Sequence, residues 1–411
     1  MAAEPATGRS RDGSPSPAAD ATPRPGGSVS AARWALLGGN FAIGCGVMVT
    51  AGALNDIVRS LAVSVAVGGQ LIAVAAVVMA LGAPLLALAV SGWDRRRLLV
   101  LALAWYGIGH ASSAAMPGYA PLLAVRALTV LGAAVFTPQA AAAIAVMTPP
   151  AERGRAITFI FIGWSLASVV GMPIAAFVGE TAGWRWAFGL VALMSLLAAA
   201  AVWRTLPDGI RPPALSLDSW RRTLTHPLLM GVVGVTALSA SGQFTLFSYF
   251  APYYRWAIGA DAATVSFLFM WFGAFGLAGN IALQRVVDRF GAARCATVAL
   301  VAIALSLLAW PLGSNAVLMA LVTTPWALGC FSSNSAQQAR LGAAAPALAP
   351  ALMALNTSAM YLGQGVGAAG GGLLVARSGF APLHAAALGW LLVAIVASAA
   401  LARRMKSGVG V

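Results

Sequence analysis

The chain is poor in charged residues, above all in acidic residues and lysine. Only 9% of its 411 residues are charged, Asp and Glu together number 11, and Lys406 is the single lysine. An average soluble domain contains about 25% charged residues. Because 60% of the residues are hydrophobic, this deficit excludes an ordinary soluble domain and predicts a protein that lies in a membrane.

Cysteine is also scarce. Cys45, Cys295 and Cys330 lie in or at the edge of apolar segments, are odd in number and lack the spacing of metal ligands. We interpret them as small hydrophobic residues of the interior. The sequence therefore predicts no disulfide framework, no metal site and no cofactor.

The basic residues outnumber the acidic ones, 25 against 11, which gives 25 − 11 = +14. In a soluble protein this excess would suggest a nucleic-acid partner. Here the arginines lie in short loops between apolar segments, where they set the orientation of a membrane protein. We therefore expect a lipid bilayer around the chain and no nucleic acid.

Twelve apolar segments are long enough to cross about 30 Å of hydrocarbon as helices. They run from Trp34 to Asn55, Leu61 to Val90, Leu98 to Met116, Tyr119 to Met147, Ala156 to Val178, Trp186 to Trp203, Leu228 to Tyr254, Ala262 to Leu283, Cys295 to Leu312, Ala316 to Ala339, Ala351 to Ala376 and Phe380 to Leu401. The expected fold class is an all-α integral membrane protein with two six-helix bundles.

The arginines predict the orientation of these spans. With the N-terminus in the cytoplasm, 20 of the 25 basic residues fall on the cytoplasmic side, and Arg59, Arg185, Arg255 and Arg377 fall on the other. The positive-inside rule then places both termini in the cytoplasm. We expect a multi-pass membrane protein.

The composition divides the chain into five parts. A tail, residues 1–33, has too few large apolar side chains to offset its ordering entropy and is expected to be disordered. A bundle at 34–204, a linker at 205–227, a second bundle at 228–402 and a tail at 403–411 follow. Gly171 and Gly365, and also Asp94 and Asp288, are 194 residues apart, which suggests a duplicated six-helix unit, a plan typical of transporters.

Arg126 is the only ionisable residue well inside a predicted span apart from His110, which lies at a similar depth in the preceding antiparallel span. An intramembrane charge is costly and is expected to face a polar cavity or a partner. Arg126, His110 and Asp56 are therefore the candidates for proton coupling. The alternatives are an arginine bound to carbonyls for packing and an interfacial histidine.

A second group of polar and aromatic residues is expected to line a substrate cavity. In the seventh span Gln243, Phe247, Phe250 and Tyr254 recur at spacings that share one helix face. An amide among aromatic rings suits an amphiphilic ligand, although packing and an interfacial aromatic belt are the alternative. The candidate cavity residues are Asn40, Gln139, Trp164, Gln243, Phe247, Phe250, Thr324, Asn334, Asn356 and Tyr361.

Small residues and proline interrupt two spans. Gly171, Met172 and Pro173 stand in the fifth, and six glycines between Gly363 and Gly372 crowd the eleventh. Glycine allows close helix approach, and proline frees a carbonyl. The pattern fits a hinge or sliding seam as well as it fits static packing.

Short motifs in a fixed order resemble the Major Facilitator Superfamily, specifically its twelve-helix bacterial drug and sugar efflux branch, over about residues 34 to 402. They include LLAVRALTVLGAAVFTPQAAAA at 122–143, GWSLASVVGMPIAA at 163–176, GWRWAF at 183–188 and VVDRFGAAR at 286–294. The resemblance implies two bundles that rock around a central cavity, in a monomeric multi-pass protein of a bacterial inner membrane.

The resemblance also implies roles for single residues. Arg126 matches the fourth-helix arginine that is thought to take part in proton transfer, and Gly171 and Pro173 match the antiporter signature. The gating motifs would be formed by Asp94, Arg95, Gly171, Pro173, Asp288, Arg289, Gly291 and Gly365.

The sequence thus predicts a secondary transporter, most simply an exporter that exchanges a small organic solute or drug for protons. Uptake or uniport on the same fold is the first alternative, because no carboxylate lies inside a predicted span. A membrane enzyme or sensor is a remote one, because no nucleophile or metal constellation is present.

Overall fold

A computed structural model describes residues 28–90, 92–149, 152–211 and 217–406. Within these ranges twelve helices are long and apolar enough to cross a membrane, each overlapping one predicted span, and no strand occurs. The predicted fold class is confirmed. The expected N-terminal tail lies almost wholly outside the described residues.

The first half of the chain forms one bundle. Its elements are α1 (Ser28–Gly52), α2 (Leu54–Ser60), α3 (Val65–Ala89), α4 (Arg95–Ala115), α5 (Tyr119–Met147), α6 (Arg153–Leu166), the π-helix η2 (Ala167–Gly171), α7 (Met172–Thr181) and α8 (Trp184–Thr205).

The short α9 (Leu217–Leu224) precedes the second bundle. That bundle contains α10 (Pro227–Phe247), α11 (Phe250–Ile258), α12 (Ala262–Phe290), α13 (Ala292–Ala309), η3 (Trp310–Leu312), α14 (Ala316–Ala344), η4 (Pro346–Leu348), α15 (Ala349–Ser378) and α16 (Leu383–Lys406).

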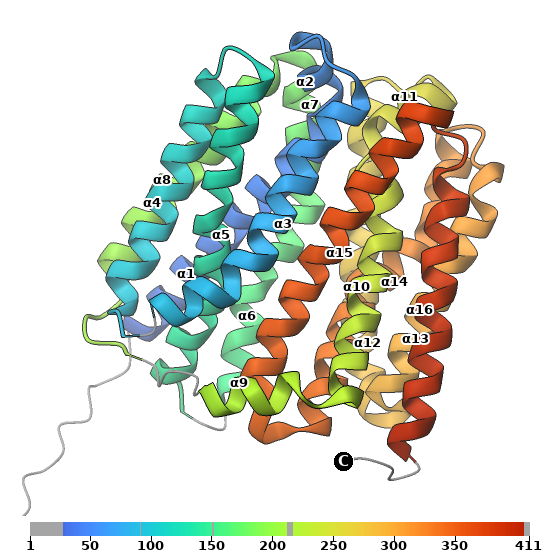
Figure 1. Ribbon diagram of the computed structural model, residues 1–411. Helices are drawn as coiled ribbons and strands as arrows, with labels where there is room; N and C mark the ends of the chain where they lie inside the picture. The colour runs from blue at the N-terminus through green and yellow to red at the C-terminus, as the bar shows by residue number, and fades with distance from the viewer. Residues whose placement is uncertain (1–27, 91, 150–151, 212–216, 407–411) are drawn as a thin grey trace, which may run out of the picture.

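The two bundles stand side by side, and the described helices begin and end at one face (Figure 1). We call the face where α1 begins and α16 ends the terminal face, and the opposite one the distal face. Helix α9 lies along the terminal face and packs against α10 and α15. Arg59 in α2 and Arg255 in α11 lie at the distal face, on the side expected to carry few basic residues.

Three predicted span boundaries were wrong. Helix α1 begins at Ser28, six residues before Trp34, and after Gly52 the chain continues in the separate α2, so Asp56 lies on a short distal helix. The seventh span ends at Phe247, and α11 starts at Phe250. Hydropathy could not locate the breaks after Gly52 and Phe247 because the residues directly flanking each are mostly apolar.

The fifth span is interrupted where the sequence contains Gly-Met-Pro. Residues Ala167–Gly171 form a π-helix between α6 and α7, directly before Pro173. Proline has no backbone N–H to donate to the preceding turn, so the regular ladder cannot continue through it. An added Cβ on Gly171 would overlap the Cys45 sulfur of α1. Glycine is therefore required where α1 crosses this segment.

Some glycines of α15 pack against a helix of the same half, and Gly365 contacts the other half. Added Cβ atoms on Gly363, Gly367 and Gly371 would overlap carbonyls of α10, in the same half. Gly365 instead faces Val77 of α3 in the other half, where its Cβ would lie 2.8 Å from the Val77 Cγ2. One face of α15 therefore packs within the second half, and another face contacts the first half.

Gly273 of α12 lies against the π-helix across the boundary between the halves. An added Cβ would lie 2.5 Å from the Ser168 carbonyl oxygen and 2.8 Å from the Val169 Cα. Because the clash is with backbone, Gly273→Ala should force the halves apart, at a cost of about 1–3 kcal/mol. We expect a lower thermal midpoint in nanodiscs.

Gly370→Ala is the matched control for this experiment, since no atom lies within 4 Å of its added Cβ. Glycine inside a helix is about 1 kcal/mol less favourable than alanine, so the control should be neutral or stabilising. Equal midpoints for the two variants would contradict the proposed contact.

Candidate functional site

Arg126 lies in α5 about seven residues from its distal end, which is roughly 10 Å along the helix axis. It is 2% exposed. Its Nη2 donates to the Gly46 carbonyl of α1 at 2.8 Å, and its Nη1 lies 3.0 Å from the His110 Nε2 of α4. Arg126 and His110, which were predicted to lie at similar depths, are in direct contact. The carbonyl bond is what the packing interpretation expects, and the histidine contact adds to it.

The hydrogen bonds fix the tautomer of His110. Its Nδ1 lies 2.9 Å from the Tyr106 carbonyl oxygen, which can only accept, so Nδ1 carries the proton. The unprotonated Nε2 then accepts from Arg126. His110 is fully buried, so its ring contacts other side chains and not solvent. The histidine is neutral as long as Arg126 occupies this position.

Two residues that the sequence analysis missed complete this cluster. The Tyr106 hydroxyl donates to the Ile43 carbonyl of α1 at 3.1 Å, and its ring stands edge-on to His110. Gly46 leaves room for both rings, because its added Cβ would overlap the Tyr106 hydroxyl. The available signal in the sequence was a tyrosine and a histidine four residues apart, which share one helix face, together with a glycine in a neighbouring span. We call Gly46, Tyr106, His110 and Arg126 the buried cation cluster.

A second charged group closes the distal face. Glu180 at the end of α7 is paired with Arg255 of α11 at 2.7 Å and with Arg59 of α2 at 3.7 Å. The Glu180 side chain is only 4% exposed. Because α7 and α11 belong to different halves, this pair joins the two bundles; we call it the distal latch.

Asp56 supports the distal latch. Its Oδ1 accepts from Arg59 at 2.6 Å, and its Oδ2 accepts from the Trp184 backbone N–H, the first residue of α8, at 2.7 Å. The hydrogen bond to Asp56 raises the pKa of the Arg59 guanidinium, which therefore stays charged. Asp56, expected as a proton carrier, has both oxygens occupied by structural bonds. Sequence reasoning missed Glu180, because the fifth span was ended at Val178.

In the first half, Thr137, which was not predicted, bridges two of the predicted cavity residues, Asn40 and Trp164. Thr137 of α5 donates to the Asn40 Oδ1 of α1 at 3.1 Å and accepts from the Trp164 Nε1 of α6 at 3.4 Å. Asn40 also donates to the Ile160 carbonyl at 3.2 Å. Gln139 is 7% exposed and has no hydrogen bond to another described residue. Its amide remains available for a ligand.

In the second half the polar residues form two groups. Asn356 of α15 accepts from Thr236 of α10 at 2.6 Å and donates to Asn334 of α14 at 3.0 Å. Gln243 accepts from the Trp326 indole at 3.1 Å.

Two further predicted cavity residues lie apart from these groups. Thr324 accepts from the Trp271 indole at 3.0 Å. Tyr361 of α15 is 6% exposed and packs into the hydrophobic core of the first half. It therefore crosses the boundary between the bundles.

Phe250 does not share a helix face with Gln243. The helix that carried this expectation ends at Phe247, and Phe250 is fully buried among Phe247, Phe272, Trp310 and Trp326. Tyr254 is likewise fully buried, so it is no part of an interfacial belt. Phe247 remains half-buried and is the aromatic member of this series that can reach a ligand.

The predicted gating motifs at the terminal face bind the start of the linker. Asp94 caps α4 by accepting from the Arg97 N–H at 3.1 Å, and it accepts from the Gly209 N–H at 2.6 Å. The Arg95 N–H donates to the Ile210 carbonyl. Arg96 pairs with Asp208 at 2.8 Å. This loop therefore holds residues 208–210 against the first half.

In the second half the corresponding motif forms the turn between α12 and α13. Gly291 has φ +81°, a conformation that favours glycine. Arg289 is exposed and stacks on Phe290, with its guanidinium carbon 5.2 Å from the ring centre. The side chain of Asp288 lies outside the described part of the structure.

Comparison with known families identifies the fold. The sequence profile described as Major Facilitator Superfamily matches residues 36–348. The chain belongs to the Major Facilitator Superfamily. Members of this superfamily are transporters of small molecules and not enzymes, and they are generally monomeric in the membrane.

Related transporters cover most of the chain. It is 27% identical to the inner membrane transport protein YdhP of Escherichia coli, over 88% of this chain and 94% of that protein. It is 31% identical to a chloramphenicol resistance protein of Streptomyces lividans, over 66% of this chain and 69% of that protein.

A solved superfamily structure supports the architecture. The crystal structure of a D-xylose-proton symporter matches with a TM-score of 0.74 and 17% identity, covering 90% of this chain and 97% of that one. At this identity the likeness establishes the shared fold. Among the described residues of this transporter, no group of three His, Cys, Asp or Glu residues is placed to hold a metal ion.

Proposed function

We propose that this transporter is a proton-coupled exporter of small organic solutes that works by alternating access. The observation that carries the proposal is the contact between Arg126 and the unprotonated Nε2 of His110. A permanently charged guanidinium and a neutral imidazole at hydrogen-bond distance form a site whose protonation depends on conformation.

The buried cation cluster couples a proton to helix movement. A second proton on His110 would place an imidazolium 3.0 Å from the Arg126 guanidinium, where like charges repel. Proton uptake by His110 therefore requires Arg126 to move. When Arg126 moves, it also leaves the Gly46 carbonyl, so proton binding loosens α5 from α1.

The described conformation is closed at the distal face. The distal latch joins the halves there, and Tyr249 of the second half stands between Gly69 of α3 and Gly372 of α15. At the terminal face the ion pairs between described residues stay within the first half, its linker or α9. We assign this arrangement to a state open toward the cytoplasm, with both termini cytoplasmic and the bundle in a bacterial inner membrane.

The residues between the halves favour an uncharged or amphiphilic substrate. The amides of Gln139 and Gln243 and the hydroxyl of Tyr361 supply hydrogen bonds, while Phe247 and Trp164 supply aromatic faces. The described residues of this set include no acidic side chain. The relative named for chloramphenicol resistance supports a phenicol-like drug as a first test compound.

The proposal is tested in inverted membrane vesicles that contain the transporter and a pH-sensitive dye. After respiration acidifies the vesicle interior, an exchanged compound should release protons and restore dye fluorescence. The panel should hold sugars, nucleosides and antibiotics including a phenicol. Proton movement in the opposite sense would identify a symporter, and substrate counterflow indifferent to a protonophore would identify a uniporter.

A further inference from the structure

Two cavities follow each other along α1 in the first half, and together we call them the furrow. Residues of α1, the start of α6 and Glu152 before it line the first cavity. Residues of α1, the π-helix η2, α7 and α8 line the second. None of the residues of the buried cation cluster lines it.

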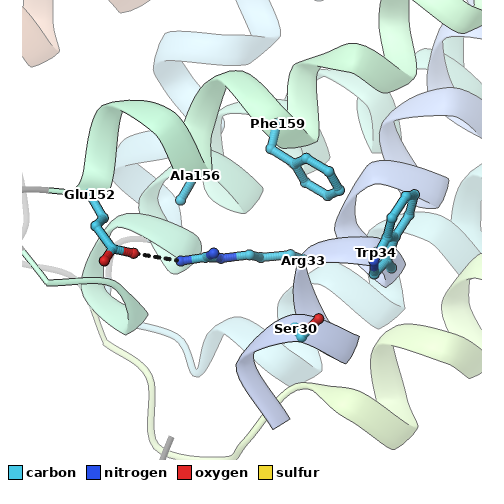
Figure 2. A pocket seen from close by; sticks show the side chains of 6 residues that line it. All are labelled: Ser30, Arg33, Trp34, Glu152, Ala156 and Phe159. Atoms are coloured by element: carbon cyan, nitrogen blue, oxygen red, sulfur yellow. Dashed lines mark ion pairs between the residues drawn. The ribbon is translucent and has the colours of Figure 1, made fainter. Parts of the chain in front are cut away.

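The terminal-face end of the furrow is polar. A cavity of about 340 Å³ is lined there by Ser30, Arg33, Trp34, Glu152, Ala156 and Phe159 (Figure 2). The Arg33 side chain extends along this cavity toward Glu152, with Trp34 and Phe159 near its other end. The two rings meet edge to face at 4.9 Å.

The charged pair in this cavity is loosely held. Arg33 and Glu152 are 3.6 Å apart, and the Glu152 side chain is 61% exposed. The Arg33 Nε is enclosed and has no hydrogen-bond partner among the described residues. A guanidinium has five N–H donors, so Arg33 has donors free for another acceptor.

Further along α1 the furrow becomes an apolar crevice. Its lining includes Phe41, Cys45, Ile174, Leu190 and Met194. Trp34, Phe41 and Cys45 lie within about 40° of one another around the axis of α1, at 100° per residue. Trp34 and Cys45 are about 16 Å apart along the helix, about half of a 30 Å hydrocarbon core. The furrow thus spans one leaflet, polar at the interface and apolar at depth.

We propose that this furrow binds one phospholipid with a zwitterionic amine headgroup. The phosphate accepts from Arg33, the ammonium pairs with Glu152, and one acyl chain lies on Phe41, Ile174 and Leu190, which are at least partly exposed. The occupant must be zwitterionic because the cavity presents one cation and one anion. A purely anionic headgroup would draw Arg33 away from Glu152 and leave that carboxylate beside a phosphate with no compensating charge. Trp34 marks the interfacial level, where tryptophan is enriched.

An acyl chain bound in the furrow would lie beside the π-helix of the fifth span. Gly171, the last residue of the π-helix, also lines the apolar crevice. The same π-helix contacts Gly273 of the second half through Ser168 and Val169. A lipid in the furrow therefore contacts the same π-helix that packs against the second half.

Native mass spectrometry of the detergent-purified transporter tests the proposal. The probes are phosphatidylethanolamine and phosphatidylglycerol with identical acyl chains, added in equal amounts. We expect retention of one phosphatidylethanolamine, at least about 5-fold above phosphatidylglycerol. Arg33→Ala should lower this adduct about 10-fold, the scale of one lost hydrogen bond to a charged group. Glu152→Gln should remove the preference for the amine.

Arg221→Ala on α9 is the matched control, since Arg221 is exposed, lies at the same face and is outside the furrow. Its lipid adducts should equal those of the unmodified chain. Equal retention of both lipids, unchanged in Arg33→Ala and Glu152→Gln, would overturn the proposal. A preference for phosphatidylglycerol, or displacement of the adduct by a transported drug, would assign the furrow to another occupant and would also overturn it.

Discussion

Transport by Arg126→Ala is expected to fall about 100-fold while the protein remains in the membrane. The side chain makes charged hydrogen bonds to His110 and Gly46, each worth about 1.5–3 kcal/mol. If these bonds govern the conformational step, losing about 3 kcal/mol corresponds to about 100-fold in rate. The measurement is drug-dependent dye recovery in inverted vesicles, normalised to protein content.

Two variants separate this function from folding. Arg126→Lys keeps the charge but loses the planar fork that reaches His110 and Gly46 together, so we expect intermediate activity. Arg221→Ala, an exposed arginine of α9, should transport normally. Full activity of correctly inserted Arg126→Ala would remove the basis for proton coupling through the buried cation cluster.

Arg255→Glu is expected to open the distal face. The substitution replaces a 2.7 Å contact between opposite charges with two carboxylates in the same place. Arg255 is partly exposed, so solvent weakens the effect; we expect the distal-open population to rise at least about 10-fold, a shift of about 1.4 kcal/mol. Transport should fall with it, because one half of the cycle is disfavoured.

Spin labels at Ala182 and Ala381, exposed distal-face positions in different halves, report this opening. The three native cysteines carry no disulfide and can be replaced first. Arg377→Glu, an exposed arginine at the same face, controls for charge alone. Distance distributions that stay unchanged in Arg255→Glu would show that Glu180 and Arg255 do not hold the halves together.

The number of spans could be predicted from the sequence because the bilayer fixes the length and the apolar character of a helix that crosses it. A segment without charged residues over the width of the hydrocarbon has few other places to lie. The same reasoning could not detect the ends of α10 and α1, because the backbone there turns within apolar sequence. Phe250 was assigned to the wrong environment for this reason, since a face argument assumes one continuous helix.

Residues of the candidate site could be predicted where their depth in the membrane is enough to place them. Arg126 and His110 were predicted at similar depths on neighbouring antiparallel spans, and in the structure they meet. The tautomer of His110 depends on the Tyr106 carbonyl, which only the helix geometry brings to Nδ1. Glu180 escaped notice because its partners, Arg59 and Arg255, come from distant parts of the chain.

The linker sets a length limit on the opening of the transporter. Residues 208–210 are bound to the first half through Asp94, Arg95 and Arg96, and α9, which begins at Leu217, packs on the second half. Only seven peptide steps separate Ile210 from Leu217, and seven residues reach at most about 25 Å when fully extended. This tether therefore limits how far the two halves can separate at the terminal face and, with it, the size of the molecules that can enter there.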